Sequence, residues 1–417
     1  MFKKISKMSI KVTNFCNLNC IYCHQLSSDK NNTETFTMYK ELRSFLQKVK
    51  FNDEVDITIT GGEISLRLQE LRKCINFINS IPVDTKFHPN IVTNGSNIKG
   101  VLKLVNSKKI RPCDVTLSWD GIHSYTKTRR GKNNVYSDAF FNNNIKTIAE
   151  YGYGKQINIV FAITPYNIDE MYDSLIYALD NGMQNFSYYF IHEGIYEDKA
   201  FVDKFQLQLQ LVLDEFKHRY NTEKRFSLYN LQSYYSRKVE KADFLSAISC
   251  LKLGNTLHFD SKGDIYGCIF FGDHKALQLG SILDGGIYPD RLEKFSHLFL
   301  DEKPSCGYEA CGSLQCFECP ASNYVNTGHM QYKLCGTCAI HHVERELFDR
   351  CISDLNISDY DYRTLWFESA NGRKDHMITK HFDKDLIGLP IANTEDHKKE
   401  ETPIMSNNLG EIEKWQL

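Results

Sequence analysis

Short strand-like and helix-like segments alternate along the first half of the chain, and this order limits the folds open to it. Runs rich in β-branched and aromatic residues predict strands at 9–15, 55–60, 88–94, 113–119, 156–164 and 185–192. Amphipathic segments lie between them, as at 38–50, where apolar residues recur at helical spacing. Six strand and helix units in series predict an α/β fold with a parallel sheet and outer helices, either doubly wound or a partial barrel.

Most of the cysteines fall into two groups along the chain. The sequence has 417 residues and 14 cysteines, with a dense group between 250 and 351. No apolar stretch reaches membrane-spanning length, and the N-terminal segment lacks the apolar core and cleavage site of a signal peptide. We therefore expect a cytoplasmic protein, in which dense cysteines hold metal rather than disulfides. With 50 basic against 52 acidic residues, the global charge favours neither nucleic acid nor a membrane as partner.

Length and composition predict several regions, because a chain of this size usually exceeds one hydrophobic core. Residues 1–221 carry the strand and helix alternation, and 222–249 look like a mostly helical connector. Residues 250–352 are rich in cysteine and glycine, and we expect metal to hold this region together. Residues 353–417 form a C-terminal extension that we expect to be partly disordered, because the stretch beyond about 385 is polar and weakly patterned.

Three cysteines, Cys16, Cys20 and Cys23, share one loop after the first predicted strand. Three thiolates can bind a zinc ion with a fourth ligand such as His24. They can also bind three irons of a [4Fe-4S] cluster whose fourth iron stays open. The loop alone leaves both interpretations open.

The motifs that follow this loop resemble, in order, those of radical S-adenosylmethionine (radical SAM) enzymes. The loop reads CNLNCIYC, with an aromatic residue before its last cysteine, and the second strand ends in TITGGEIS. The third strand ends in IVTNG, the fourth ends in LSWDG, and KTRRG follows. The resemblance implies a partial (β/α)6 TIM-like barrel with a small cysteine-rich iron-sulfur domain after it. It also implies that S-adenosylmethionine is bound by Gly61, Gly62, Glu63, Asn94, Ser118, Asp120 and Arg130.

The resemblance also implies roles for these residues. Glu63 would meet the amino group of the methionine moiety, Ser118 and Asp120 would lie at the ribose side, and Arg130 would lie near the carboxylate. Glycines let backbone approach a ligand, and a carboxylate pairs with an ammonium. The implied cofactors are a [4Fe-4S] cluster with an open iron site and S-adenosylmethionine, whose reductive cleavage gives a 5′-deoxyadenosyl radical. The electron would come from an external donor such as flavodoxin or ferredoxin.

The C-terminal cysteines resemble the SPASM extension of radical SAM enzymes that modify peptides and proteins. Its opening joins Cys250 to Cys268 through Gly263 and predicts a strand, a glycine turn and a strand. The CxxC pairs 316/319 and 335/338 also fit a zinc ribbon by spacing alone. A longer insert than the usual SPASM spacing leaves the ligand partition open. One or two auxiliary iron-sulfur clusters would be held by members of the set Cys250, Cys268, Cys306, Cys311, Cys316, Cys319, Cys335, Cys338 and Cys351.

We predict an enzyme of this class that acts on a peptide or protein side chain. The favoured reaction is maturation of a ribosomally made peptide, in which hydrogen abstraction leads to a thioether or carbon–carbon cross-link. One alternative is a sulfatase-maturing enzyme that makes formylglycine, with Asp273 as its general base. Another is a zinc-binding adaptor whose cysteines only hold the fold. Cys74 and Cys113 are expected to be small buried hydrophobes, and the aromatic run 185–192 to line the barrel or pack in its core.

Overall fold

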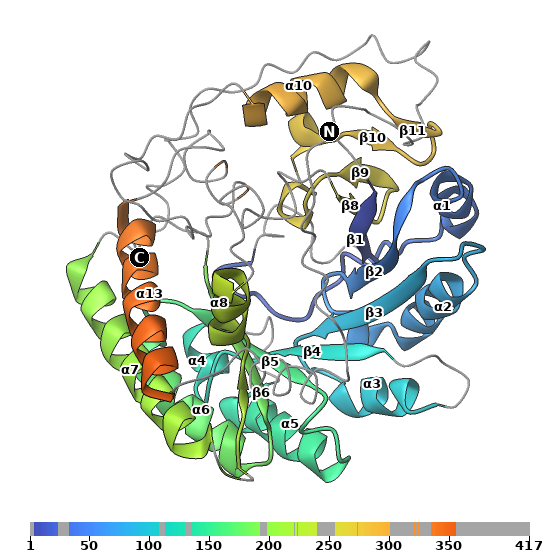
Figure 1. The fold of residues 1–417 in the computed structure, drawn as a ribbon. Helices are drawn as coiled ribbons and strands as arrows, with labels where there is room; N and C mark the ends of the chain where they lie inside the picture. The colour runs from blue at the N-terminus through green and yellow to red at the C-terminus, as the bar shows by residue number, and fades with distance from the viewer. Residues whose placement is uncertain are drawn as a thin grey trace.

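The computed structural model describes residues 4–23, 33–107, 113–129, 136–191, 198–220, 222, 224–239, 255–272, 274–300, 321, 324 and 335–355. Its centre is one curved sheet, which carries helices on its outer side (Figure 1). Within the described residues the strand order is β11-β10-β9-β8-β1-β2-β3-β4-β5-β6-β7.

Six strands in chain order form a continuous parallel series in this sheet, as predicted. Each pairs in parallel with the next. The first spans Ile5–Lys11 rather than 9–15, and it ends at Lys11 because the chain beyond it bonds to the loop that follows the second strand. The strands are β1 (Ile5–Lys11), β2 (Phe51–Thr60), β3 (Lys86–Thr93), β4 (Asp114–Ser118), β5 (Asn158–Ile163) and β6 (Asn185–Phe190).

Helices connect these strands and cover their outer face. Parallel neighbours need crossover connections of this kind, and the crossovers place every helix on one side. Strand order and helix placement confirm the partial (β/α)6 barrel (Figure 1). The helices are α1 (Tyr39–Leu46), α2 (Leu68–Asn79), α3 (Ile98–Val105), α4 (Ser124–Lys127), α5 (Asp138–Glu150), α6 (Met171–Asp180) and α7 (Lys199–Tyr220), with short 3-10 turns at η1 (Ile64–Leu66) and η2 (Ile168–Glu170).

The two faces of the sheet differ in chemistry. Alternate residues of each strand are apolar and form one buried core with the helices. Neighbours along a strand point to opposite faces, so the other set faces the inside of the barrel. That set is polar: Ser9 Oγ lies 2.7 Å from His258 Nδ1, and Thr116 Oγ1 donates to Asn90 Oδ1 over 3.1 Å. The barrel therefore encloses a polar inner wall.

The sheet continues into the start of the cysteine-rich region. β8 (Thr256–Phe259) pairs in parallel with β1, and β9 (Asp264–Tyr266) returns antiparallel to β8. Gly263, in the turn between them, has a φ of 83°, which favours glycine. This is the predicted strand, glycine turn and strand. The sheet then ends in β10 (Gly280–Ser281) and β11 (Gly286–Ile287), separated from β9 by η4 (Ile269–Phe271) and η5 (Lys275–Leu277) and followed by α10 (Pro289–Leu300).

A long C-terminal helix packs against the last part of the barrel. The described part of the predicted connector contains β7 (Ser227–Leu228) and α8 (Tyr229–Val239), and α13 (Cys335–Leu355) lies along α7 and α8 (Figure 1). Tyr188 of β6 donates to Glu344 of α13 over 2.7 Å. No helix in the described part of the chain is long and apolar enough to cross a membrane. The region boundaries at 221, 249 and 352 stay predictions.

Candidate active site

The loop that carries the first three cysteines, residues 13–23, leaves the sheet at the carboxyl end of β1. We call it the cysteine loop. Its first carbonyls are bonded to the turn after β2: Gly62 N donates to Thr13 O and Glu63 N donates to Phe15 O, each over 2.7 Å. Loops at this end of parallel strands form the sites of barrel enzymes. The cysteine loop is therefore in the predicted position, beside the glycine turn.

The backbone of the cysteine loop lies so close to that turn that Gly61 and Gly62 have no room for a side chain. A Cβ on Gly62 would lie 2.2 Å from Phe15 O, and one on Gly61 would lie 2.6 Å from Thr13 O. Both distances are far shorter than van der Waals contact, and both neighbours are backbone atoms that cannot rotate away. Close approach of backbone to backbone thus requires glycine here. Their predicted contact with a ligand stays a prediction.

Glu63 connects the ends of β2 and β3. Its Oε1 accepts from Ser65 N over 2.9 Å and from Thr93 Oγ1 over 2.5 Å, and its Oε2 accepts from Asn94 N over 2.6 Å. The side chain is buried, and burial raises the pKa of its carboxyl while these hydrogen bonds oppose the rise. Glu63 is therefore a structural acceptor in the protein alone, whatever it binds in addition.

Polar side chains hold the cysteine loop from two further sides. Asn14 Nδ2 donates to Ser261 Oγ in the β8–β9 hairpin over 2.9 Å. Asn17 Nδ2 donates to Ser96 Oγ over 2.8 Å, and Asn94 Nδ2 donates to Asn17 Oδ1 over 3.3 Å. Asn94, predicted to contact the cofactor, is thus placed directly against the loop between Cys16 and Cys20.

The three thiols of the cysteine loop are partly buried and form no disulfide. Burial raises the pKa of Cys20 to about 12, Arg129 opposes the rise, and Cys23, Asp120 and Cys16 add to it. Among the residues that the structure describes, no three His, Cys, Asp or Glu side chains form a group placed to hold a metal ion. The case for a cluster here rests on three thiols sharing one short loop, which is the donor set of an iron-sulfur site.

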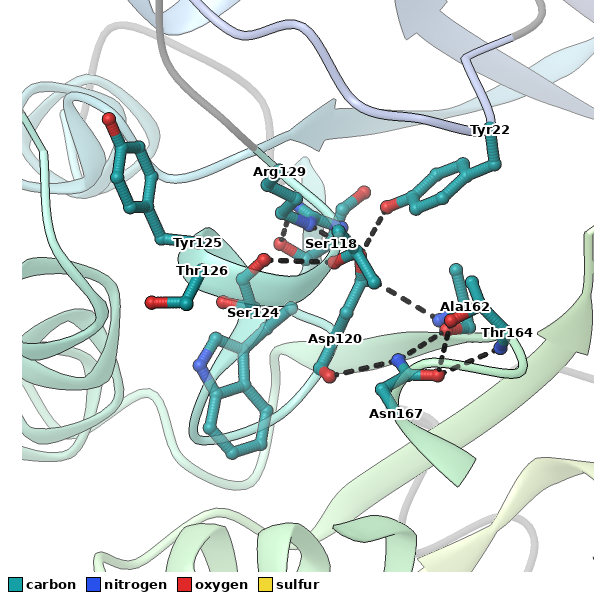
Figure 2. Close-up of polar contacts among 12 residues, drawn as sticks. Tyr22, Ser118, Asp120, Ser124, Tyr125, Thr126, Arg129, Ala162, Thr164 and Asn167 are labelled. Carbon is teal, nitrogen blue, oxygen red and sulfur yellow. Dashed lines mark hydrogen bonds and ion pairs between the residues drawn. The ribbon is translucent and has the colours of Figure 1, made fainter. Parts of the chain in front are cut away.

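A buried ion pair lies next to the cysteine loop (Figure 2). Arg129 donates to Asp120 through Nε over 2.7 Å and through Nη2 over 2.8 Å, and its Nη1 donates to Ser118 O over 2.7 Å. Thr128 Oγ1 and the hydroxyl of Tyr22 also donate to the Asp120 carboxylate. The side chains of Asp120 and Arg129 are 0% and 3% exposed.

Sequence reasoning found Asp120 but missed its two main partners. Arg130, the predicted arginine, lies outside the described residues, and it is its neighbour Arg129 that pairs with Asp120. Only the adjacent arginines of KTRRG signalled that one of them could face inward. Tyr22 was recognised as an aromatic residue of the cysteine motif, but nothing in its spacing indicates a hydrogen bond to β4. The ribose contacts predicted for Ser118 and Asp120 stay predictions.

The described part of the second cysteine group is dispersed. Cys268 is buried just after β9, and Cys338 is partly buried in the first turns of α13. Cys351 is 2% exposed and faces α7, and burial raises the pKa of its thiol to about 12. At 1.5 Å per residue, Cys338 and Cys351 are about 20 Å apart along α13. These two residues therefore cannot bind the same cluster.

Several predicted residues lie outside the part of the chain that the structure describes. Cys335 is the first residue of α13, but its side chain is not among those that the structure describes. Cys74 is fully buried in the core as expected, whereas Cys113 is only partly buried and packs against the core. The predicted residues that lie entirely outside the described part of the chain are His24, Arg130, Cys250, Asp273, Cys306, Cys311, Cys316 and Cys319.

The aromatic run of β6 divides between the two faces of the sheet. Tyr188 is buried on the outer face, where its ring contacts Phe205 of α7. Tyr189 is 38% exposed and lies opposite Ala162 in the register of β5 and β6. Both predicted roles for the run are therefore filled, by alternate residues.

Comparison with known proteins finds sequence similarity between the barrel and one superfamily. Residues 10–189 match the family model of the Radical SAM superfamily. An uncharacterised protein of Methanocaldococcus jannaschii is 26% identical over 278 residues, which are 64% of this chain and 86% of that protein. An S-adenosylmethionine-dependent nucleotide dehydratase of Flammeovirga pacifica is 31% identical over 163 residues, 37% of this chain and 52% of that protein.

Solved structures share the fold over most of the chain. The structure of anSMEcpe with bound AdoMet matches with a TM-score of 0.66 and 17% identity, over 88% of this chain and 98% of that one. Streptococcus suis SuiB bound to S-adenosylmethionine matches with a TM-score of 0.56 and 15% identity, over 80% of this chain and 77% of that one. At such identities the likeness establishes the α/β partial-barrel fold.

Proposed function

We propose that this chain is a radical SAM enzyme that oxidises a side chain of a peptide or protein. The observation that carries the proposal is the cysteine loop, which places three thiols beside the glycine turn at the carboxyl edge of a barrel that matches the Radical SAM superfamily model. Cys16, Cys20 and Cys23 would hold three irons of a [4Fe-4S] cluster and leave the fourth iron open. With S-adenosylmethionine bound, that cluster supplies the 5′-deoxyadenosyl radical. A zinc-binding adaptor is disfavoured because it would have no use for this domain.

The residues around the loop are suited to binding S-adenosylmethionine. Asn94, which follows β3, bonds to the cysteine loop. Ser118 is the last residue of the neighbouring strand β4 and lies on the polar face of the sheet. Arg130, as a cation near the carboxylate of the methionine moiety, and Gly61, Gly62 and Glu63 complete the proposed set. These residues would orient the sulfonium, and the barrel would exclude water from the radical.

A peptide substrate is supported by two structural relatives and by the inner wall. anSMEcpe has been solved with AdoMet and the Cp18Cys peptide, and SuiB has been solved with its precursor peptide SuiA. The inner wall of this barrel carries hydroxyl, amide and imidazole groups, such as Asn158, which donates to Ser187 over 3.0 Å. Such groups can pair with the amides of an extended peptide.

We favour peptide maturation that forms a thioether or carbon–carbon cross-link. Such a bond removes two hydrogens from the peptide, one as an atom taken by the radical and one as a proton. The remaining electron needs an acceptor, for which we propose an auxiliary iron-sulfur cluster of the second cysteine group. Cys268, Cys338 and the cysteines outside the description are its proposed ligands, whereas the burial of Cys351 against α7 leads us to omit it.

Formylglycine formation by a sulfatase-maturing enzyme is the alternative, with Asp273 as its proposed base. Product mass separates the two reactions on a cysteine peptide. A cross-link removes only hydrogen, whereas conversion of cysteine to formylglycine replaces its sulfur with oxygen. Flavodoxin or ferredoxin is the proposed electron donor for either reaction.

Metal analysis tests the proposal at the level of the cofactor. Anaerobically purified protein should be brown and carry about eight to twelve irons with matching sulfide, as expected for two or three cubane clusters. Replacing Cys16, Cys20 and Cys23 with Ala should remove about four of these irons. Cys113→Ala, outside both cysteine groups, is the matched control and should keep them all. A colourless protein with stoichiometric zinc would overturn the proposal.

A further inference from the structure

Tyr22 connects the cysteine loop to the buried ion pair of Asp120 and Arg129. It lies between Cys20 and Cys23, and its hydroxyl donates to Asp120 Oδ2 (Figure 2). Its neighbour Ile21 is bonded to the same segment, because Ile21 N donates to Thr128 O over 3.0 Å. The second half of the cysteine loop is thus held by residues that follow β4, whereas its first half is held by Asn94 and Ser96, which follow β3.

The ion pair is itself fixed to three parts of the barrel. Arg129 bonds to both Asp120 oxygens and to the carbonyl that ends β4. Ala162 N of β5 donates to Asp120 Oδ1 over 3.2 Å. Asn167 Nδ2 donates to the backbone oxygens of Asp120 and Ala162 over 3.1 and 2.9 Å. A bidentate, buried pair with this many bonds gives Tyr22 a rigid acceptor.

The Asp120 carboxylate has little capacity for another ligand. It accepts from Tyr22, Thr128, twice from Arg129, and from Ala162. A carboxylate offers about four lone-pair sites, so these five donors fill them. The side chain is also 0% exposed, so a ribose hydroxyl could reach it only after the pair opened.

We propose that Asp120 and Arg129 are positioning residues, which hold the Cys20–Cys23 half of the cysteine loop in place through the hydroxyl of Tyr22. They do so in the protein alone, before any cofactor binds. The purpose of this placement rests on the proposed function, because it would preset the thiols for a cluster. The anchoring itself does not depend on that function, and its test uses metal-free protein.

Alkylation of the thiols in the full-length, metal-free protein tests the anchoring. Tyr22→Phe keeps the ring and the local charges and removes only the hydroxyl. A hydrogen bond to a charged acceptor is worth enough that its loss should let the loop open about tenfold more often. Iodoacetamide should then label Cys20 and Cys23 about tenfold faster than in the wild type. Labelling of Cys16 and of the core residue Cys74 should not change.

Tyr125→Phe is the matched control for this experiment. Tyr125 lies in α4 beside the network, and its buried hydroxyl has no hydrogen-bond partner among the described residues (Figure 2). The same atom is therefore lost without loss of an anchor, and labelling rates should equal those of the wild type. Equal rates in Tyr22→Phe and wild type would overturn the proposal, as would equal acceleration by both variants.

A second variant tests the same anchor independently, in case Tyr22→Phe does not fold. Thr128→Val removes another donor to Asp120 and keeps the volume of the side chain, so it should also speed labelling of Cys20 and Cys23. Unchanged labelling in both Thr128→Val and Tyr22→Phe would exclude the anchor. Failure of the wild type to take up iron would refute the proposed function but would leave the labelling result unaffected.

Discussion

At the scale of single residues, the site is shaped by contacts of the protein with itself. Gly61 and Gly62 were predicted to let backbone approach a ligand, but the structure shows that they first let the turn after β2 approach the cysteine loop. Glu63 was predicted to meet an ammonium, and it also bonds to two backbone amides and a hydroxyl. Residues of a cofactor motif can therefore be required by the fold before any cofactor binds.

Gly62→Ala tests this structural role. The added Cβ would lie 2.2 Å from Phe15 O, so the turn and the loop must separate. Forcing such an overlap should lower the free energy of unfolding by about 2 kcal/mol, measured by urea denaturation. The variant should also lose the irons of the cysteine loop.

Gly152→Ala is the control for the loss of a glycine. Gly152 has a φ of 77°, but a Cβ there would meet no atom within 4 Å. The Gly152→Ala variant should lower the free energy of unfolding by about 1 kcal/mol through backbone strain, and it should keep all of its iron. Full iron and wild-type stability in Gly62→Ala would show that the close approach is not maintained.

At the scale of elements, the β8–β9 hairpin joins the second cysteine region to the barrel. β8 extends the sheet beyond β1, and Asn14 of the cysteine loop bonds to Ser261 in the hairpin turn. Asp260 at the end of β8 accepts from the backbone amides of Lys262 and Asp264, each over 2.9 Å. Burial raises the pKa of Asp260 from its ordinary value of 3.8 to about 6, Asp264 adds to the rise, and Lys11 opposes it.

This shift predicts a pH dependence of stability. A carboxyl whose pKa is raised by folding contributes stability that is complete below pH 3.8 and is lost as pH rises through about 6. Asp260→Asn keeps the acceptor oxygen and removes the charge. At pH 7 the free energy of unfolding of this variant should exceed that of the wild type by on the order of 2 kcal/mol, so the variant is more stable. The difference should vanish near pH 4.

Urea denaturation at several pH values measures this difference. Asp53→Asn, an exposed aspartate of β2, is the control and should not change the pH profile. A variant Asp260→Asn that is less stable than the wild type at pH 7 would show that the charged carboxylate is favoured in the hairpin, contrary to the assignment.

α13 gives a second prediction at this scale. Cys351 is buried against α7 and is about 20 Å from Cys338 along the helix, so we expect it to pack rather than to bind iron. Cys351→Ala should lower the free energy of unfolding by about 1 kcal/mol and leave iron content unchanged. Cys338→Ala should reduce iron content. Equal iron loss in the two variants would restore Cys351 to the ligand set.

At the scale of the whole molecule, the parallel barrel was predictable and its side-chain network was not. The strand predicted at 55–60 lies within β2, and the one predicted at 88–94 overlaps β3 except for its last residue, because buried parallel strands leave a strong apolar pattern. The order of CNLNCIYC, GGE and SWDG along the chain predicted which strand ends meet. The partner of Asp120 depends on which of two adjacent arginines turns inward, and the bond from Tyr22 spans 98 positions. Neither relation leaves a periodic signal in the sequence.

The central claim is that the cysteine loop supports cleavage of S-adenosylmethionine, and one measurement tests it most directly. Anaerobically reconstituted wild-type protein, given reductant and S-adenosylmethionine, should release 5′-deoxyadenosine and methionine in equal amounts. Cys20→Ala should release none, and Cys113→Ala should match the wild type. The account would be contradicted if fully iron-loaded wild-type protein released no 5′-deoxyadenosine, or if Cys20→Ala released as much as the wild type.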